Sequence, residues 1–280
     1  MSIHGVLGES TSYPQSYDNS VLFAISRTIG RDEILAKSGV SAEHLMAGVD
    51  VWQAFELSWL NPQGISKVAI ARITIPADSP NIVESKSLKL YLNSLNFTQF
   101  DDVSAVKQTI ERDLTACVGA SVTVLISSLD GADFAVVQPV GECIDAVLDG
   151  GDAVAVVDDV DASLLGTAVD GVVQTYQFHT NLLRSNCPVT NQPDWGTLSV
   201  SITTAKQVEY AKVLAYVLSF RKHNGFHEQC VEQIFADLLT VYATTSLMVQ
   251  ANYTRRGGID INPVRVLNHP MTNIGRLVRQ

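Results

Sequence analysis

Apolar and polar side chains alternate along several stretches of the chain, as they do in β-strands that bury one face. In the first half the alternation runs from Val51 to Trp59 and from Val68 to Ile75, with Asn61-Pro62-Gln63-Gly64 between them. A Pro/Gly turn between two alternating stretches is typical of a β-hairpin. We therefore expect two paired strands here, and further strands at 122–127 and 134–140.

Between these strands the apolar spacing changes to three and four residues, which is the period of an amphipathic helix. One such stretch covers 84–96 and a second covers 102–117. Their apolar stripes are Leu88, Tyr91, Leu92 and Leu95 in the first, and Val103, Val106, Ile110 and Leu114 in the second. We expect two helices that each pack one side against the sheet.

The second half repeats this order. Strands are expected at 172–183 and 197–203, helices at 209–222 and 227–242, and closing strands at 247–253 and 259–266. Glu84 and Ser94 in the first half match Glu209 and Ser219 in the second, each 125 positions later. An internal duplication explains this order. Strands grouped around helix pairs, without strict βαβ alternation, predict an α+β protein with a largely antiparallel sheet.

The composition divides the chain into four segments. We expect an extended N-terminal arm over 1–45, a first module over 46–141, a linker over 142–167 and a second module over 168–280. The linker interleaves aspartates with Ala, Val and Gly, but it lacks the central Gly and closing Glu of a Ca²⁺-binding EF-hand loop. An acidic connection with one short strand is the expected structure.

Composition also narrows the class of protein. A chain of 280 residues with 46% hydrophobic content is long enough to bury a sizeable core. No apolar run reaches the length of a membrane span, and the polar start is not a secretory signal. Four cysteines without a CxxC pair fit a reducing compartment, so we expect a cytoplasmic protein. The net charge of −10 argues against direct binding to nucleic acid.

The densest run of turn-forming residues covers 184–196. Its prolines and its Asn, Ser and Asp side chains disfavour a regular helix or strand. Cys187 is the one cysteine of the four in such a polar segment, and Asp194 follows seven residues later. A loop folded back on itself would bring a thiol and a carboxyl together, which suits thiolate attack on an electrophile with proton transfer to the adduct.

The run Ser185-Asn186-Cys187-Pro188-Val189-Thr190-Asn191-Gln192-Pro193-Asp194-Trp195-Gly196 resembles the active-site segment of the NADPH-dependent 7-cyano-7-deazaguanine reductases, the nitrile reductases of queuosine biosynthesis. A second run, Glu84-Ser85-Lys86-Ser87-Leu88-Lys89-Leu90-Tyr91, resembles the signature that separates these reductases from the related GTP cyclohydrolases. Phe226-His227-Glu228 resembles a third motif of the family.

The resemblance implies a fold, a reaction and an assembly. The fold would be two tandem tunnelling-fold modules, each a mostly antiparallel sheet with a pair of antiparallel helices layered on one face. The reaction would be the four-electron reduction of the nitrile of 7-cyano-7-deazaguanine to 7-aminomethyl-7-deazaguanine, with two NADPH per turnover and no metal. The deazapurine would be the small-molecule partner, and the chain would form a homodimer.

The resemblance also implies roles for single residues. Cys187 would add to the nitrile to form a thioimidate, Asp194 would donate a proton to the nitrogen, and His227 would assist proton transfer. Glu228 would bind the guanine-like edge of the base. Phe226 would form an apolar wall, and Glu84 would contact the base or the imine from the other module.

Cofactor residues are expected outside any Rossmann or P-loop motif, since neither GxGxxG nor GxxxxGK[ST] occurs. The resemblance implies that the signature beginning at Glu84 helps to bind NADPH. Ser85 and nearby helix N–H groups could accept an anion, while Lys86 and Lys89 supply positive charge. Arg255, Arg256 and Gly257 offer further charge and flexible backbone for its phosphates.

Two other classes of function remain open. His223 and His227 are four positions apart, and with Cys187 or Cys230 they could form a zinc site of a cyclohydrolase-type hydrolase. Gly225 argues against this site because it interrupts the helix that would place both rings on one face. The other alternative is a non-catalytic module that binds a purine or pterin.

Overall fold

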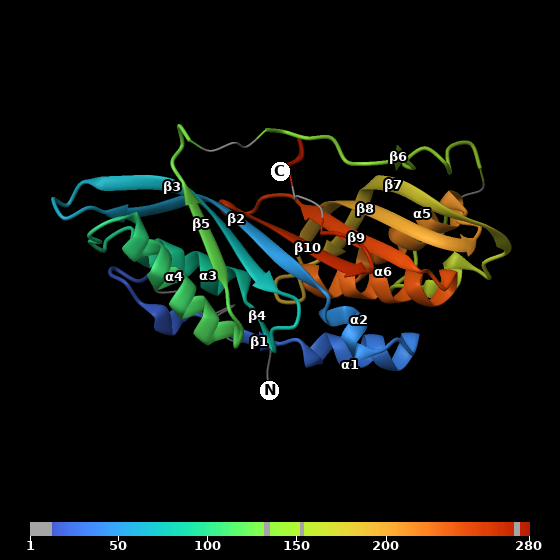
Figure 1. Ribbon diagram of the computed structural model, residues 1–280, viewed down its shortest axis with the longest axis horizontal. Coiled ribbons are helices and arrows are strands. Elements are labelled where there is room, and N and C mark those ends of the chain that lie inside the picture. The colour runs from blue at the N-terminus through green and yellow to red at the C-terminus, as the bar shows by residue number, and fades with distance from the viewer. Residues whose placement is uncertain (1–12, 132–134, 152–153, 272–274) are drawn as a thin grey trace. The chain divides into compact units, whose positions relative to one another are not determined.

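The computed structural model describes residues 13–131, 135–151, 154–271 and 275–280. Within these residues the chain divides into two compact units (Figure 1). Unit 1 comprises residues up to Ile29, Val49–Phe134 and Arg255–Ile261, whereas unit 2 comprises Gly30–Gly48, Ala135–Thr254 and Asn262–Gln280. Each unit is described by itself below.

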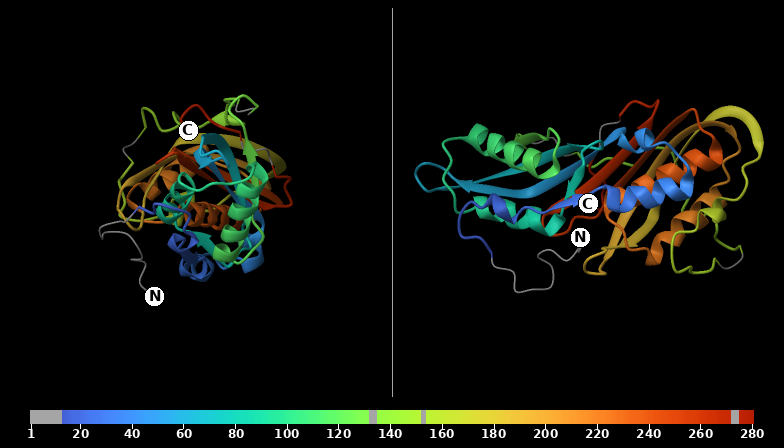
Figure 2. Two further views of the ribbon diagram at one scale, coloured as in Figure 1. Left: turned by 90° about the vertical axis from the view of Figure 1, so that its left-hand side faces the viewer. Right: turned by 90° about the horizontal axis from the view of Figure 1, so that it is seen from below.

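Unit 1 has an antiparallel sheet with the strand order β5-β3-β2. Strand β2 (Gly48–Leu60) forms the expected hairpin with β3 (Ser66–Pro76), and β5 (Thr123–Ser127) pairs with β3. Helices α3 (Ser85–Leu95) and α4 (Val103–Val118) pack against this sheet (Figures 1 and 2). Leu88, Ile110 and Leu114 are fully buried against strand residues such as Trp52 and Ile73, so the two predicted helical stripes are confirmed as core except at Val103, which is exposed in the first turn of α4.

Unit 2 has the same kind of layers. Strands β7 (Asp170–Asn186), β8 (Pro193–Lys206), β9 (Ser246–Tyr253) and β10 (Ile259–Leu267) are neighbours in an antiparallel order. Helices α5 (Tyr210–Ser219) and α6 (His227–Tyr242) cover one face, as Figure 2 shows. Alternate residues of β8 and β9, such as Leu198 and Val249, enter the helix-facing core. Ser199 and Gln250 lie opposite each other on the other face.

Each unit also contains a short segment that packs beside its first long helix. In unit 1 the 3₁₀ helix η1 (Asn19–Val21) starts at Asp18, and in unit 2 η2 (Ala162–Leu165) starts at Asp161. Each aspartate accepts hydrogen bonds from the N–H and hydroxyl of the serine two residues later. The backbone N–H of each aspartate in turn donates to the matching pair Ser94 and Ser219. The duplicated positions therefore occupy equivalent local structures.

A buried tyrosine–aspartate pair joins the two long helices in each unit. Tyr91 on α3 donates to Asp113 on α4 at 2.7 Å, and Tyr216 on α5 donates to Asp237 on α6 at 2.5 Å. All four residues are buried. A buried carboxylate needs such donors, because an unpaired one would lose its hydration without replacement. The repeated pair fixes how the second helix of each unit lies against the first.

The N-terminal residues differ from the extended arm that the sequence predicted. Strand β1 (Ala24–Ser26) pairs with β4 (Asn81–Val83), but residues 28–46 form helices α1 (Thr28–Ser38) and α2 (Ala42–Met46). Helix α1 has a weak apolar stripe, and its Arg31 is buried by an ion pair with Glu232 at 2.7 Å. Because tertiary contacts rather than apolar spacing stabilise α1, its sequence pattern gave no helical signal.

Two other expectations need adjustment. The strand expected at 134–140 is wrong for residues 135–140, which form no strand and make an isolated bridge from Val136 to Arg276, whereas Phe134 lies outside the described residues. The acidic segment contains one short strand, β6 (Glu142–Cys143), parallel to β7, besides η2. The α+β class with mainly antiparallel pairing is confirmed, and the four predicted segment boundaries stay a prediction.

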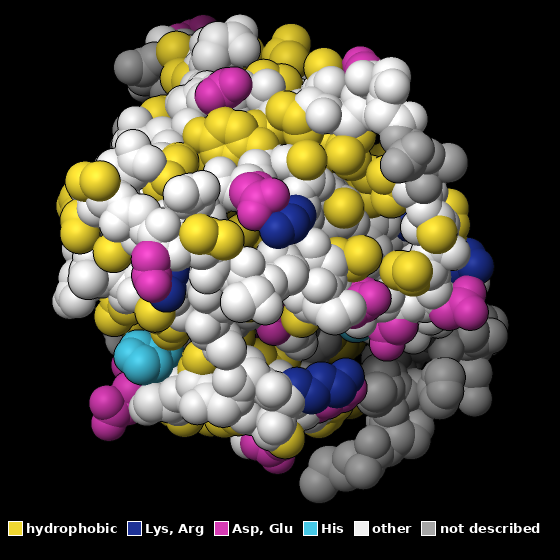
Figure 3. Space-filling view, turned by 90° about the vertical axis from the view of Figure 1, so that its right-hand side faces the viewer, with side chains coloured by type: hydrophobic (Ala, Val, Ile, Leu, Met, Phe, Trp, Pro, Cys, Tyr) yellow, Lys and Arg dark blue, Asp and Glu magenta, His cyan; other side chains and the backbone are white. Residues whose placement is uncertain are grey.

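Charged side chains are spread over the surface. On the face drawn in Figure 3, Lys and Arg side chains stand singly beside Asp or Glu instead of gathering into a basic patch. Among the helices of the described ranges, none combines the length and the apolar composition needed to cross a bilayer.

Candidate active site

Cys187 lies in the turn between β7 and β8 of unit 2. Its N–H donates to the carbonyl of Gln192 at 2.9 Å, and its carbonyl accepts from the N–H of Asn191 at the same distance. Asn191 has φ of 53°, a left-handed conformation that Asn tolerates better than most residues. The turn is shorter than expected, since only residues 187–192 lie outside the strands. Cys187 is half-buried in this turn and forms no disulfide.

Asp194 lies in strand β8 and not in the loop that the sequence predicted. It is opposite Ser185 of β7, two residues before Cys187, and only 3% of its surface is exposed. The hairpin therefore brings a buried carboxyl and a thiol to the same end of two paired strands. Pairing in a ladder also fixes the backbone of Asp194 more tightly than a loop would.

The loop before α6 is tied to the end of β7. Asn186 N–H donates to the carbonyl of His223 at 2.8 Å, and Gly225 N–H donates to the carbonyl of Asn186 at 3.1 Å. A Cβ on Gly225 would lie 2.6 Å from Nε2 of His223 and 3.3 Å from Sγ of Cys230. Only glycine fits such a close approach. These contacts place the start of α6 beside the residue that precedes Cys187.

His227 begins α6 and faces Asp194. Its Nε2 lies 3.8 Å from Oδ2 of Asp194, which is an ion-pair distance when the imidazole is protonated and too long for a hydrogen bond. The imidazole also packs edge-to-face on the ring of Tyr253, with 4.0 Å between the ring centroids and an interplanar angle of 83°. Tyr253 ends strand β9 and is 1% exposed. The sequence gave no functional signal for Tyr253, because it continues an alternating strand pattern.

Glu228 follows in the first turn of α6 and is 3% exposed. The positive end of a helix dipole stabilises a carboxylate at that position. Phe226 precedes the helix, and its N–H donates to Oε1 of Gln229 at 3.2 Å, which satisfies one N–H group at the helix start. The structure thus gathers four predicted residues, Cys187, Asp194, His227 and Glu228, into the region where the β7–β8 turn meets the start of α6.

Other cysteines have different surroundings. Burial raises the pKa of Cys230 to about 12, against the lowering effect of hydrogen bonds with Ser185 and Tyr253, and the carboxylates of Asp194 and Glu228 add a smaller upward effect. Burial raises the pKa of Cys117 to about 11. Both thiols are therefore kept protonated at neutral pH, and a protonated thiol is a poor nucleophile. Cys143 is exposed on the short strand β6.

Glu84 is the N-cap of α3 in unit 1. One carboxylate oxygen accepts from the N–H of Lys86 at 2.9 Å and the other accepts from the N–H of Ser87 at 2.7 Å. Glu84 is 5% exposed. The expectation that helix N–H groups receive an anion of the cofactor is therefore wrong for these two groups, because Glu84 already occupies them. Its predicted contact with the substrate stays a prediction.

The predicted cofactor residues come only partly together. Lys89 and Gly257 line one pocket of about 180 Å³ in unit 1, together with Glu56, Asn93 and Asn96. Gly257 has φ of 60°, and a Cβ there would lie 3.2 Å from Cδ and Cε of Lys89. Ser85, Lys86 and Arg256 are not part of its lining.

Arg255 precedes the Gly257-Gly258 turn and lies over Phe55 of strand β2. Its guanidinium carbon is 4.5 Å from the centroid of the Phe55 ring, a cation–π contact. Phe55 N–H donates to the carbonyl of Gly258 at 2.9 Å, so the Gly257-Gly258 turn runs beside the strand. Lys89 and the two glycines therefore line the pocket, whereas Arg255 lies over Phe55 and is not part of the lining. The sequence did not single out Asn93 and Asn96, because they read as ordinary polar helix positions.

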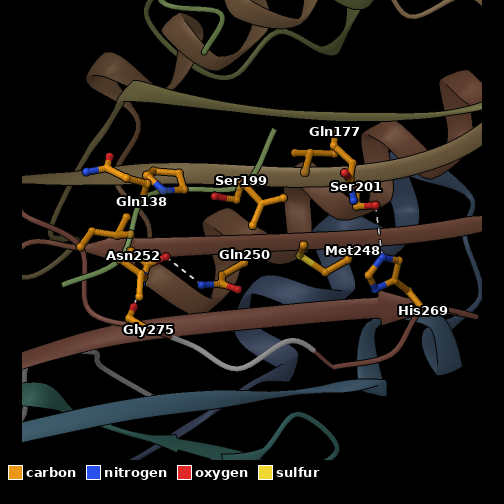
Figure 4. Close-up of a pocket in the computed structure, with 14 residues that line it drawn as sticks. Gln138, Gln177, Ser199, Ser201, Met248, Gln250, Asn252, His269 and Gly275 are labelled. Carbon is orange, nitrogen blue, oxygen red and sulfur yellow. Dashed lines mark hydrogen bonds between the residues drawn. The ribbon is translucent and has the colours of Figure 1, made fainter. Parts of the chain in front are cut away.

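A second pocket, of about 110 Å³, lies on the face of the unit 2 sheet opposite the helices (Figure 4). Ser199, Ser201, Gln250 and Asn252 line it with uncharged polar groups. Oδ1 of Asn252 accepts from the Gln250 amide at 2.8 Å, and His269 Nε2 lies 3.1 Å from the Ser201 hydroxyl. These polar groups are bonded in pairs, and the rest of the lining, which includes Val137, Val140 and Met248, is largely apolar.

The histidines considered as zinc ligands have other neighbours. Nδ1 of His223 lies 2.6 Å from a carboxylate oxygen of Asp159 in the acidic segment, and His227 faces Asp194. Lys222 likewise pairs with Asp158 at 2.7 Å. In the described part of the chain, no three His, Cys, Asp or Glu side chains converge as metal ligands would. Two residues of the acidic segment thus contact the loop that leads into α6.

Comparison with known proteins agrees with this geometry. Residues 13–126 match a family described as "Nitrile reductase, 7-cyano-7-deazaguanine-reductase N-term", and residues 193–271 match one described as "QueF-like protein". The chain is 55% identical to a protein of Psychrobacter cryohalolentis and 55% identical to one of Psychrobacter arcticus, in each case over the whole of both chains. It is 48% identical to a protein of Acinetobacter baumannii over 93% of this chain and 92% of that protein.

All three relatives are named NADPH-dependent 7-cyano-7-deazaguanine reductase. A solved structure, "Crystal structure of the archaeosine synthase QueF-Like in the apo form", matches with 13% identity and a TM-score of 0.32. It covers 37% of this chain and all of its own. That likeness is too slight to support an argument.

Proposed function

Because the chain belongs to the family of NADPH-dependent 7-cyano-7-deazaguanine reductases, we propose that it reduces the nitrile of 7-cyano-7-deazaguanine through a covalent adduct at Cys187. The observation that carries this proposal is the placement of the Cys187 turn. The turn that carries the half-buried Cys187 joins the two strands at the end where the buried carboxyl of Asp194 lies, and the start of α6, with His227 and Glu228, is tied to that same end. A nucleophile, a proton donor and a base-binding carboxylate are the groups that addition to a nitrile requires.

The Cys187 thiol passes its proton to Asp194, the thiolate sulfur adds to the nitrile carbon, and Asp194 returns the proton to the nitrogen, which gives a neutral thioimidate. Oδ2 of Asp194 and Nε2 of His227 are 3.8 Å apart, so a proton can pass between them after a small closure. The thiol leaves again once the carbon has been reduced to a thiohemiaminal, and the resulting imine is reduced to the amine. Because only 3% of Asp194 is exposed, water has little access to the proton donor itself.

Glu228 binds the base. A carboxylate accepts two parallel hydrogen bonds from the ring N–H and the exocyclic NH₂ of a guanine-like edge, and charge-assisted bonds of this kind are short and strong. The adjoining Phe226 is partly exposed at the helix start and offers an apolar surface to the base. The helix dipole helps to keep Glu228 ionised for this role.

NADPH supplies two hydrides per turnover, each accompanied by one proton from the site or from solvent. Lys89, Arg255 and the Gly257-Gly258 turn hold its phosphates at the pocket of unit 1. We place the cofactor signature of residues 84–91 in a first module over 46–141 and the nucleophile in a second module over 168–280.

Assembly and location complete the proposal. Strand β5 is the outer strand of its sheet and exposes Leu125 by 60%, and an open strand edge of this kind pairs readily with another chain. A homodimer would cover that edge. Free cysteines at all four positions are typical of the reducing cytoplasm.

The test is the mass of the intact protein after mixing with 7-cyano-7-deazaguanine in the absence of NADPH. We expect a gain equal to the whole ligand in the unmodified protein. Cys187→Ala should show none, and Cys143→Ala, which removes an exposed thiol elsewhere, should show the full gain. Bound ligand without an adduct would overturn the covalent route and favour a non-catalytic binding module. Zinc in the purified protein together with hydrolysis would favour the cyclohydrolase class.

A further inference from the structure

We propose that Tyr253 is a positioning residue, whose ring fixes the imidazole of His227 beside Asp194. The inference rests on the proposed role of His227 in proton transfer. The two rings are in direct contact, with 4.0 Å between centroids and an 83° interplanar angle. Edge-to-face contact favours one orientation of the imidazole over the others. In that orientation Nε2 of His227 points to Oδ2 of Asp194 at 3.8 Å.

The backbone of Tyr253 is held on both sides. Its carbonyl accepts from the amide of Gln280 at 3.1 Å, and the next residue, Thr254, donates its N–H to the carbonyl of Trp195 at 2.8 Å. Trp195 adjoins Asp194 in β8. The strand ladder therefore links the position of the tyrosine to that of the carboxyl on which His227 acts.

Gly196 leaves room for the tyrosine ring. It pairs with Tyr253 across β8 and β9, and a Cβ at Gly196 would lie 3.3 Å from Cδ1 of Tyr253 and 3.5 Å from Cδ2 of Leu183. A side chain at this position would force the ring to move by a few tenths of an ångström. The glycine two residues after Asp194 thus permits the ring position that the imidazole packs against.

The ring of Tyr253, and not its hydroxyl, makes the contact that matters. The hydroxyl is buried near the Cys230 thiol and Ser185. Burial raises the pKa of Tyr253 well above its usual range, so the group is neutral. A phenol with so high a pKa is a poor acid, and the contact with the imidazole is made by the ring. Its function is to restrict the rotation of His227.

The experiment is a double-mutant cycle between Tyr253 and His227. Turnover is followed by NADPH consumption over hours, so that slow variants are measured, for Tyr253→Leu, His227→Ala and the double variant. We expect Tyr253→Leu to lose about 10- to 100-fold in turnover, which is less than the roughly 10²- to 10⁴-fold of a complete general acid–base contribution, because the imidazole is misplaced and not removed. In the His227→Ala background the same change should cost less than about twofold, because residues that act through one group are not additive.

Three controls separate positioning from a general loss of structure. Tyr253→Phe keeps the ring and should retain at least about ten times the turnover of Tyr253→Leu. Tyr242→Leu truncates another fully buried tyrosine of the same core and should lower the melting temperature comparably with little loss of turnover. Gly196→Ala retains Tyr253 but moves its ring, and its loss of turnover should also vanish without His227. Because Gly196→Ala keeps the buried ring, it tests the inference even where Tyr253→Leu does not fold.

Equal losses from Tyr253→Leu with and without His227 would overturn the inference and leave Tyr253 a structural residue. Equal losses in Tyr253→Phe and Tyr253→Leu would overturn it in favour of the hydroxyl. The covalent adduct at Cys187, measured in every variant without NADPH, tests the proposed function independently. An adduct with no coupling would defeat the positioning role alone, whereas no adduct in the unmodified protein would defeat the proposed function.

Discussion

The two units share one architecture but keep a buried carboxylate at the start of different helices. In unit 1 Glu84 caps the first long helix, α3, and is 5% exposed. In unit 2 the matching Glu209 stands before α5 without a side-chain cap bond and pairs with Lys212 at the surface. The buried carboxylate of unit 2 is Glu228, at the start of the second helix, α6.

At the start of the second long helix the difference is reversed, because the buried carboxylate is in unit 2 and the exposed one is in unit 1. Helix α4 of unit 1 starts at an exposed Asp102, whose side chain accepts from the N–H of Ala105 at 2.8 Å. Helix α6 follows its N-cap Phe226, and its first turn holds the half-buried His227 and the buried Glu228. The scaffold pairs Tyr91–Asp113 and Tyr216–Asp237 are alike in both units. The residues that join the two long helices are therefore alike in both units, whereas the helix starts differ.

The largest expected effect comes from replacing, one at a time, the two glutamates at the helix starts of unit 2. Glu228→Gln should lower kcat/KM for the nitrile by about 10- to 100-fold, since a hydrogen bond to a charged group is worth about 1.5–3 kcal/mol. Glu209→Gln is the matched control at an exposed helix start, and it should change kcat/KM by less than about twofold. Steady-state kinetics at varied nitrile concentration measures both. Similar losses in the two variants would show that the duplicated helix starts had not diverged.

The same comparison extends to stability. Glu84→Ala removes the acceptor of two backbone N–H groups and should lower the free energy of unfolding by about 1 kcal/mol. Glu209→Ala removes no cap bond and should cost about 0.5 kcal/mol or less. Urea unfolding of both variants measures these two losses in the free energy of unfolding. A larger loss at Glu209 would contradict the assignment of the buried cap to unit 1.

A third pair of variants tests the proposed cofactor site of unit 1. Gly257→Ala places a side chain on a left-handed residue next to Lys89, so it should raise KM for NADPH and cost about 1–2 kcal/mol of stability. Gly150→Ala imposes a similar left-handed strain at φ of 76° in open space, where it should cost stability alone. Measuring KM for both substrates separates the effects. An unchanged KM for NADPH in Gly257→Ala would remove this turn from the site.

The smallest effect concerns the pH dependence of unit 2. Burial raises the pKa of Asp237, against the lowering effect of hydrogen bonds from Tyr216 and Gln233. Because the folded state then binds the proton more tightly, this group favours folding below its unfolded pKa of about 3.9 and loses that contribution as pH rises through the folded pKa.

Asp237→Asn should therefore flatten the fall in stability as pH rises from about 4. At Asp145 burial also acts to raise the pKa, but hydrogen bonds from Thr180 and Asn181 outweigh it and the net shift is downward. The contribution of Asp145 to the free energy of unfolding is present above its unfolded pKa and is lost as pH falls through its folded pKa. Urea midpoints across a pH series should show opposite slopes for Asp237→Asn and Asp145→Asn, and slopes of one sign would contradict these assignments.

Local sequence patterns determined most of the elements of each unit. Alternation and apolar stripes predicted β2, β3, α3 and α4 within one to three residues, because these elements bury one face against a single core and their periods record it. The repeat of Glu84 and Ser94 at Glu209 and Ser219 indicated the duplication. The motifs around Cys187 and Glu228 indicated where chemistry would lie, since residue types alone restrict which reactions are possible.

Tertiary structure alone decided what depends on distant partners. Helix α1 exists because Arg31 meets Glu232, which lies 201 residues away, and no local period encodes that ion pair. Glu84 and Glu209 occupy matching positions in the sequence. The packing around α3 buries Glu84, whereas Glu209 stays at the surface. Asp194 lies in a paired strand, and Tyr253 contacts His227 only because β9 lies beside β8 and beneath α6. The sequence determined the elements and the reactive groups, and the folded contacts determined which groups meet.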